Sequence, residues 1–220
     1  MNTLSYYDAS GESYFSSTVN ADMSAAWKRF SFFLKRGRIL DFGCGSGRDS
    51  RHFLYRGYEV EAWDGSEVMC RLASAYTGLE VKQRRFEELD AVECFDGIWA
   101  CASILHLERR FLPEIFLKME RALRPGGFIY ASFKFGEEEG WRGERYFTCF
   151  TQRSMIAFVD KLPSLETVSI WTSSDCLRGR EDEKWLNVML KKVYLETACN
   201  QSGVNFDQDL PLRGGEGTVL

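Results

Sequence analysis

Three glycines and one nearby acid form the part of this sequence that is best suited to bind a ligand. The segment ILDFGCGSGRDS, residues 39–50, places Gly43, Gly45 and Gly47 directly after a short β-like run. Glycines in such a turn let a ligand approach the backbone closely. Because position 48 is arginine, the spacing fits G-x-G-x-G more closely than the dinucleotide pattern G-x-G-x-x-G, and the sequence contains no Walker phosphate loop.

Asp41 narrows the choice of ligand. Backbone N–H groups bind a pyrophosphate, and a carboxylate two residues before the first glycine would repel it. The same carboxylate suits a ligand that carries a positive amino group. S-adenosylmethionine has such an ammonium group beside a positive sulfonium and has no phosphate, so Asp41 favours it over NAD.

Asp64 is a second acid in a suitable position. It lies 21 residues after Gly43, at the end of the next expected strand. A carboxylate there can accept hydrogen bonds from both hydroxyls of a ribose. Proteins that bind NAD share this feature, so Asp64 indicates an adenosine ribose without separating the two cofactors. The alternative is that Asp41 and Asp64 only cap turns.

The elements expected around these residues alternate between strand and helix. Strand-like patterns cover residues 38–43, 58–64, 79–86, 95–103 and 128–136. Helical patterns cover 20–37 with Asn20 or Asp22 as cap, 47–57, 66–78 with Ser66 as cap, and 112–127. This alternation predicts an α/β fold with a doubly wound parallel sheet. A charged connection over 137–148, a helix capped by Thr151 and two β-like stretches, 165–174 and 184–195, follow.

Composition and charge exclude several classes of protein. The chain has 220 residues and a net charge of −4, which argues against broad nucleic-acid binding. Seven cysteines without a C-x-x-C pair and only two histidines argue against a disulfide framework and a metal site. The sequence shows no membrane-spanning run and no signal-peptide pattern. We therefore expect a soluble, cytoplasmic protein without a metal, for which a monomer is a plausible state.

Four segments, in this order, resemble the class I S-adenosylmethionine-dependent methyltransferases. ILDFGCGSGRDS is similar to their first motif, VEAWDGSEVM to the ribose-binding second strand, FDGIWACASILHL to the fourth strand and LRPGGFIYASF to the stretch before strand five. The closest subgroup is the small bacterial methyltransferases that include the tellurite-resistance type. The resemblance implies a Rossmann-like, seven-stranded, mostly parallel sheet in the order 3-2-1-4-5-7-6, with flanking helices and the last inserted strand antiparallel. Residues 165–174 and 184–195 would supply its last two strands.

The resemblance also implies which residues bind the cofactor. Asp41 and Gly43 would face its methionine part, with Gly45 and Gly47 allowing its close approach. Asp64 would hold the ribose, while Gly65, Ser66 and Met69 would border the adenosine. Phe86 and Glu87 would lie against the adenine, and Ala100 would offer backbone near the sulfonium. Arg85 stands near the point where many members have an acid for the adenine amino group, which leaves adenine recognition to Glu87 or to backbone; Phe86 fits the core equally well.

Candidate residues for the chemistry follow the fourth strand. His106 is the best-placed general base, needed only if the acceptor must lose a proton; the alternative is a structural or substrate-orienting histidine. Cys101 lacks the preceding proline of cytosine-C5 methyltransferases, so we interpret it as a small core residue. Since the Asn/Asp-Pro-Pro-aromatic element is also absent, we expect a small-molecule or anionic methyl acceptor. Its candidate ligands are Arg145, Tyr146, Arg178, Arg180 and Trp185.

The chain divides into three predicted parts: an N-terminal lid and helix (1–36), the cofactor-binding methyltransferase domain (37–195) and a C-terminal tail (196–220). We expect Tyr14 and Phe15 to fold over the cofactor, where an aromatic face would attract the sulfonium, with Gly11 giving the lid flexibility. Two alternatives to methyl transfer remain: a catalytically inactive S-adenosylmethionine-binding partner or sensor module, and an NAD(P)-dependent oxidoreductase.

Overall fold

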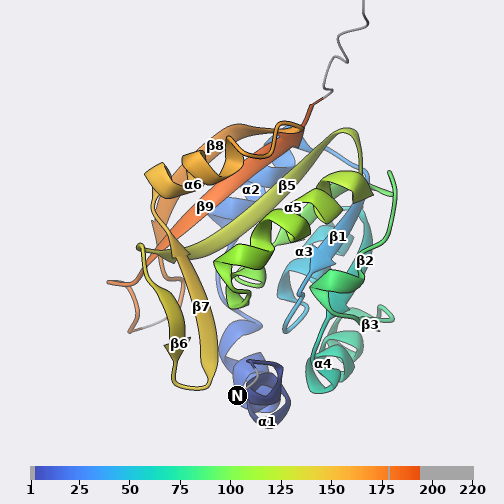
Figure 1. The fold of residues 1–220 in the computed structure, drawn as a ribbon. Helices are drawn as coiled ribbons and strands as arrows, with labels where there is room; N and C mark the ends of the chain where they lie inside the picture. The colour runs from blue at the N-terminus through green and yellow to red at the C-terminus, as the bar shows by residue number, and fades with distance from the viewer. Residues whose placement is uncertain (1–2, 178, 194–220) are drawn as a thin grey trace, which may run out of the picture.

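Strands and helices alternate along the chain in the computed structural model, which describes residues 3–177 and 179–193 (Figure 1). The strands are β1 (Arg38–Phe42), β2 (Glu59–Asp64), β3 (Lys82–Gln83), β4 (Phe95–Ala100), β5 (Leu123–Phe135), β6 (Glu139–Arg142), β7 (Arg145–Phe150), β8 (Leu165–Ser174) and β9 (Lys184–Lys192). The α-helices are α1 (Thr3–Thr18), α2 (Ser24–Phe33), α3 (Arg48–Tyr55), α4 (Glu67–Thr77), α5 (Leu112–Ala122) and α6 (Gln152–Val159). Short 3₁₀ turns are η1 (Phe86–Glu88), η2 (Ile104–His106) and η3 (Arg109–Phe111).

The central sheet has the predicted strand order. Strands β3, β2, β1, β4 and β5 lie side by side and run parallel. β9 pairs antiparallel with β5, and β8 pairs antiparallel with β9. With β8 and β9 counted as the sixth and seventh strands, this is the order 3-2-1-4-5-7-6 with the last inserted strand antiparallel, so the predicted fold class is confirmed. β7 and β6 add two strands at the end of β5, which gives nine strands and not the predicted seven.

Helices cover both faces of this sheet because apolar side chains alternate along its strands. Ile39 and Trp99 join one buried cluster with residues of α2 and α3. Their neighbours Leu40 and Ile98 join a second cluster with residues of α5 and α6. In Figure 1, α5 and α6 lie in front of the sheet and α2 lies behind it. With both faces covered, the carboxyl ends of the parallel strands are the place for a ligand.

The segment 137–148 is a β-hairpin, not the charged connection that we expected. β6 and β7 pair antiparallel, with Arg142 opposite Arg145. Gly143 has a φ of 63° and is the first residue of the two-residue turn between them, a position that favours glycine in tight hairpins. β7 continues beside the end of β5. The turn glycine was a visible signal, but the charged residues around it hid the alternation.

The N-terminal segment is a helix that packs along α4. The Ser66 hydroxyl donates to Asp8 at 2.6 Å, which ties α1 to the start of α4. A Cβ at Gly11 would lie 2.6 Å from Cγ1 of Val68, so glycine at this position allows the two helices to approach closely. The expectation that Gly11 gives flexibility is therefore wrong.

The remaining expectations differ from the structure mainly at the ends of helices and strands. Ser66 and Thr151 cap α4 and α6 as predicted, and Asp22 accepts the N–H of Ser24 at 2.8 Å at the start of α2. β3 is much shorter than the expected strand over 79–86. The predicted tail, 196–220, lies outside the described residues. Among the residues that the structure describes, no helix is both long and apolar enough to cross a membrane.

Candidate active site

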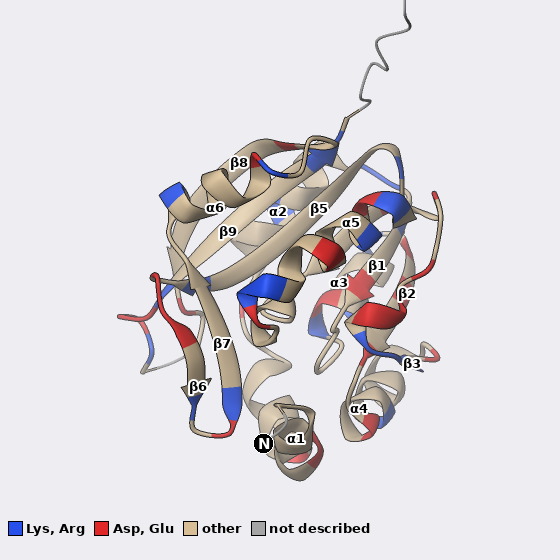
Figure 2. Cartoon of the chain, in the orientation of Figure 1, with Lys and Arg blue, Asp and Glu red and all other residues tan. Residues whose placement is uncertain are grey.

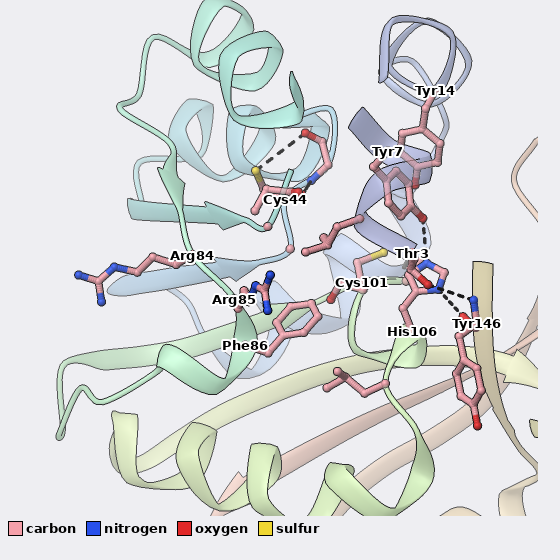
Figure 3. Close-up of a pocket in the computed structure, with 18 of the residues that line it drawn as sticks. Thr3, Tyr7, Tyr14, Cys44, Arg84, Arg85, Phe86, Cys101, His106 and Tyr146 are labelled. Carbon is pink, nitrogen blue, oxygen red and sulfur yellow. Dashed lines mark hydrogen bonds between the residues drawn. The ribbon is translucent and has the colours of Figure 1, made fainter. Parts of the chain in front are cut away.

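A cavity of about 400 Å³ lies at the carboxyl ends of the central strands, between the glycine loop and α1. Eight of the residues predicted to bind the cofactor or to act as the base line it: Tyr14, Gly43, Gly45, Asp64, Gly65, Phe86, Glu87 and His106. In Figure 3, Tyr7 and Tyr14 lie on one side of this first cavity and Arg84, Arg85 and Phe86 on the other. Phe86 also packs on Phe42, with ring centroids 4.8 Å apart, so it belongs to the cavity wall and to the core.

Five other predicted residues do not line the cavity: Asp41, Gly47, Ser66, Met69 and Ala100. They support its wall from behind. Gly47 precedes α3 with a φ of 75°, and a Cβ there would lie 2.7 Å from the Thr77 side chain. Ser66 accepts the N–H of Met69 as the cap of α4. These residues shape the loop and the helix starts without facing the cavity.

Asp64 ends β2 with its carboxylate held by two backbone groups. The N–H of Gly45 donates to one oxygen and that of Ser66 to the other, each at 2.9 Å. Burial raises the pKa of Asp64, and these two N–H groups act in the opposite direction. Because each carboxylate oxygen has a further lone pair, Asp64 can still accept hydroxyl groups of a ligand.

Asp41 lies behind the glycine loop. Its side chain is buried, with the residue 1% exposed, and accepts the hydroxyl of Ser50 at 2.5 Å. Burial, together with the neighbouring Asp49 carboxylate, raises the pKa of Asp41 to about 8. With this pKa the carboxyl is mostly protonated at pH 7 in the free protein, and it does not line the cavity.

A buried ion pair, which the sequence analysis missed, forms part of the cavity wall. Arg48 donates to both carboxylate oxygens of Asp49, at 2.9 and 2.8 Å. The indole N–H groups of Trp27 and Trp99 donate to the same carboxylate, each at 2.9 Å. Burial opposes ionisation of Asp49, but Arg48 and the indoles lower its pKa. The Arg-Asp pair directly after the third glycine, Gly47, was the available signal.

His106 is held at both ring nitrogens (Figure 3). Nδ1 lies 2.6 Å from the carbonyl oxygen of Tyr146 and therefore donates to it. Nε2 then accepts the hydroxyl of Tyr7 at 2.8 Å. Burial lowers the pKa of His106 to about 4, with the Arg145 cation acting in the same direction. The imidazole is therefore neutral at pH 7, and Tyr7 occupies its lone pair.

Tyr7 is a site residue that the sequence analysis did not name. Tyr7 and Tyr14 lie seven residues apart on α1, and their ring centroids are 5.0 Å apart. This spacing places them on one face of a helix, so recognition of α1 as a helix would have paired them. Phe15 points elsewhere and packs on Tyr76, with ring centroids 5.7 Å apart.

A second cavity, of about 950 Å³, adjoins the first. The two share Tyr7, Tyr14, Thr18, Arg48, Cys101, Ala102 and His106. Arg145, Arg180 and Trp185, three of the predicted acceptor ligands, line this second cavity, whereas Tyr146 lines the first. Arg178 lies outside the described residues.

The wall between the two cavities is the turn after β4. Ala102 has a left-handed φ of 52°, which is uncommon outside glycine, and its N–H donates to the Ser132 hydroxyl at 2.8 Å. This turn brings Ala102 to both cavities, whereas Ala100 is fully buried and paired with Ala131. Cys101 packs partly against the core, as interpreted, but also lines both cavities. Burial raises the pKa of its thiol, so it remains protonated.

Among the described residues, no group of three or more histidine, cysteine or acidic side chains is arranged to hold a metal ion.

Comparison with known proteins adds family information to this geometry. Residues 39–127 match the family model of a methyltransferase domain. The chain is 26% identical over 120 residues to the ubiquinone biosynthesis O-methyltransferase of Rickettsia conorii, which covers 52% of this chain and 41% of that protein. It is also 26% identical over 136 residues to the probable S-adenosyl-L-methionine-dependent methyltransferase TehB of Haemophilus influenzae, covering 57% and 46% respectively. The chain thus spans less than half the length of these relatives.

A similar solved structure is that of the 1,6-didemethyltoxoflavin-N1-methyltransferase of Burkholderia thailandensis, with bound 1,6-didemethyltoxoflavin and S-adenosylhomocysteine. It has a TM-score of 0.70 over 87% of each chain at 20% sequence identity. This likeness shows the fold, the family model adds the methyltransferase domain, and the TehB relative is named as S-adenosyl-L-methionine-dependent. The matched region, residues 39–127, is therefore a methyltransferase domain similar to those of the class I S-adenosylmethionine-dependent family, as its motifs predicted.

Proposed function

We propose that this chain transfers a methyl group to a small organic acceptor bound in the second cavity. The observation that carries the proposal is the shared wall of two adjoining cavities, one lined by the glycine loop and Asp64, the other by aromatic and basic side chains. When bound, S-adenosylmethionine supplies a methyl group activated by its positive sulfur; the acceptor's lone pair forms the new bond to carbon as the carbon–sulfur bond breaks toward sulfur.

The residues of the first cavity fit this cofactor. Gly43, with a φ of 86°, has no room for a side chain, because a Cβ would lie 2.5 Å from Cβ of Ser103; the bare backbone leaves space for the ligand. Asp64 would accept the ribose hydroxyls, and Phe86 and Glu87 would border the adenine. Tyr14 would cover the cofactor from α1.

His106 orients Tyr7 in this proposal and does not serve as a general base. With Nδ1 bound to a carbonyl, Nε2 bound to a hydroxyl and a pKa of about 4, it does not take up a proton at pH 7. It holds the Tyr7 hydroxyl at the wall shared by the two cavities. Positioning of this kind supplies much of the rate when the transferred group is already activated.

We place the protein in the cytoplasm, as the sequence analysis expected. The described cysteines are free thiols, which supports a reducing compartment.

The test begins with the cofactor. S-adenosylmethionine and S-adenosylhomocysteine should raise the melting temperature, whereas NAD and NADP should leave it unchanged. Incubation with methyl-labelled S-adenosylmethionine and a cell extract should then label the low-molecular-mass fraction. Stabilisation by NAD would favour the oxidoreductase alternative. Binding of S-adenosylmethionine without label in any fraction would favour the sensor alternative.

A further inference from the structure

We infer that the acceptor is a planar organic acid whose anionic group is bound by Arg145. The inference rests on the proposed function, because it assigns the second cavity to the methyl acceptor. It follows from the size of that cavity, the residues of its wall and the distribution of ion pairs around it.

The size and the wall of the second cavity suit a molecule with one or more rings. A volume of about 950 Å³ lies in the range that holds drug-sized ligands. Its aromatic lining side chains are Tyr7, Tyr14, Tyr130, Phe135, Phe147, Trp171 and Trp185. Aromatic walls bind planar ring systems by stacked and edge-to-face contacts. A small inorganic oxyanion would leave most of this volume to water.

The second cavity is positively charged although the whole chain is not. Its basic lining residues are Arg48, Lys134, Arg142, Arg145, Arg180 and Lys184, and its acidic ones are Asp22, Asp175, Asp182 and Glu183. Six positive and four negative groups line it; with Asp49, which pairs with Arg48 from the wall of the first cavity, the balance is +1, against −4 for the full sequence. A cleft with such a balance concentrates anions.

Most of the buried cations around this cavity are neutralised by carboxylates. Arg48 pairs with Asp49 at 2.8 Å. Lys134 lies 3.0 Å from Asp175 and also pairs with Glu183. Their charges are therefore satisfied before any ligand arrives.

Arg145 differs from these cations. Its guanidinium lies over the rings of Tyr6 and Phe147, 4.7 and 5.2 Å from their centroids, and is near enough to the Tyr7 hydroxyl to act on it electrostatically. Within residues 3–177 and 179–193, no carboxylate forms an ion pair with this half-buried guanidinium. Since a guanidinium binds a carboxylate through two parallel N–H bonds, a ligand acid can supply the missing partner.

The position of Arg145 also connects the acid to the methyl-transfer site. Arg145 lies near Tyr7, and Tyr7 belongs to the wall that the two cavities share. An acid bound there would fix one end of a planar acceptor close to that wall. Arg145 is thus a specificity-determining residue for the acceptor, and it does not line the first cavity.

The test compares two probes of the same shape, of which only the first is charged: naphthalene-2-carboxylate and naphthalene-2-carboxamide. Both are titrated by calorimetry into the full chain, with and without saturating S-adenosylhomocysteine. The carboxylate should bind at least tenfold more tightly than the carboxamide.

Arg145→Gln should weaken carboxylate binding at least tenfold while leaving the affinities for the carboxamide and for S-adenosylhomocysteine within twofold. Arg145→Lys should recover part of the loss. Arg153→Gln, on the exposed side of α6 and outside both cavities, is the matched control for charge and should leave all affinities unchanged.

Equal affinities for the two probes, no binding of either, or carboxylate binding that is unchanged in a folded Arg145→Gln would overturn the inference. If Arg145→Gln does not fold, the inference is tested by the ratio of the parent's affinities for the carboxylate and the carboxamide, and by the change of this ratio in Arg145→Lys. Failure of S-adenosylhomocysteine to bind would instead contradict the proposed function, and the titrations without it would still test Arg145.

Discussion

Asp64 connects the glycine loop to the start of α4 before any ligand binds. Asp64→Ala removes the proposed ribose contact, and a hydrogen bond to a charged group contributes about 1.5 to 3 kcal/mol. Because about 1.4 kcal/mol corresponds to a tenfold change in affinity, S-adenosylhomocysteine should bind about ten- to a hundredfold more weakly. Asp64→Asn should recover part of the loss. Calorimetric titration of the three proteins measures this effect, and parental affinity in Asp64→Ala would place the ribose elsewhere.

The same substitution should also affect stability, which the sequence alone did not indicate. Asp64→Ala leaves the N–H groups of Gly45 and Ser66 without their carboxylate acceptor. The melting temperature without ligand should therefore fall in Asp64→Ala and fall less in Asp64→Asn.

His106 provides a prediction that needs no knowledge of the acceptor. Only His52 and His106 are present, so their imidazole signals can be separated by nuclear magnetic resonance of histidine-labelled protein. With its pKa lowered to about 4 by burial, His106 should show no titration midpoint between pH 8 and 5. An inflection near pH 6.5, assigned by its absence in His106→Gln, would contradict the buried, doubly bonded arrangement and restore His106 as a candidate base.

Among individual residues, the sequence predicted best those whose type is dictated by the backbone or by a strand end. Gly43 was predicted from the turn after the first strand and Asp64 from the end of the second strand, and both line the cavity. Tyr7 was missed, and Arg145 was one of five candidate acceptor ligands that the sequence could not rank, because the positions of both depend on packing between α1 and the β6–β7 hairpin. The N–H of Tyr146 donates to the Thr3 hydroxyl at 3.1 Å, across 143 positions of sequence.

Among the elements, hydrophobic periodicity predicted the buried ones and missed those held by tertiary contacts. β4 is an apolar run at the centre of the sheet and was easily recognised. α1 is rich in serine and tyrosine, contains Gly11 and buries little of its surface, so its pattern does not resemble an amphipathic helix. Contacts with α4 stabilise it, and such contacts cannot be read from local sequence.

The α1 helix should control access to the first cavity. Thr3, Leu4, Tyr7 and Tyr14 of this helix line the cavity, so deletion of residues 1–18 should weaken S-adenosylhomocysteine binding at least tenfold while the sheet stays folded.

A single substitution, Gly11→Ala, tests the packing of α1 against α4 without removing the helix. Alanine favours a helix by about 1 kcal/mol over glycine. Overpacking against Val68 costs about 1 to 3 kcal/mol and should outweigh this gain. We expect a loss of affinity of about three- to tenfold.

Glu12→Gln is the matched control on the same helix. Glu12 is exposed, and its ion pair with Arg71, at 3.1 Å, lies at the surface. Such a pair contributes at most about 1 kcal/mol, so affinity should change little. Calorimetry measures binding, and far-ultraviolet circular dichroism measures the fold, in the deletion variant, Gly11→Ala and Glu12→Gln. Unchanged affinity in a folded deletion variant would show that α1 is not a lid.

Across the whole molecule, charge is kept out of the sheet and is found at its margins. Figure 2 shows β5 and β9 uncharged along most of their length, with charged residues on the helices and on the β6–β7 hairpin. Among the described residues, the buried exceptions are Asp41, Asp49, Lys134 and Asp175. Lys134 and Asp175 pair with each other at 3.0 Å. Arg48 compensates Asp49, whereas Asp41 has only the Ser50 hydroxyl as a hydrogen-bond partner among the described residues. The stability of the whole fold should therefore depend on the protonation of Asp41.

This dependence has a definite sign. The folded-state pKa of Asp41 is raised to about 8, above the value of about 3.9 in an unfolded chain. Between these values the folded protein binds the extra proton, so the contribution of Asp41 to the free energy of unfolding falls as the pH rises, by up to about 1.4 kcal/mol per pH unit. Asp41→Asn imitates the protonated carboxyl and does not titrate. In urea unfolding from pH 5 to 9, its stability relative to the parent should grow up to about pH 8 and then level off. Below pH 6.5 the contribution of His106 to the free energy of unfolding rises with pH, opposite to that of Asp41. His106 is present in both proteins, so its contribution cancels in the difference between their free energies of unfolding. A difference that does not change with pH would mean that Asp41 is already ionised in the free protein, ready to attract the ammonium group of the cofactor.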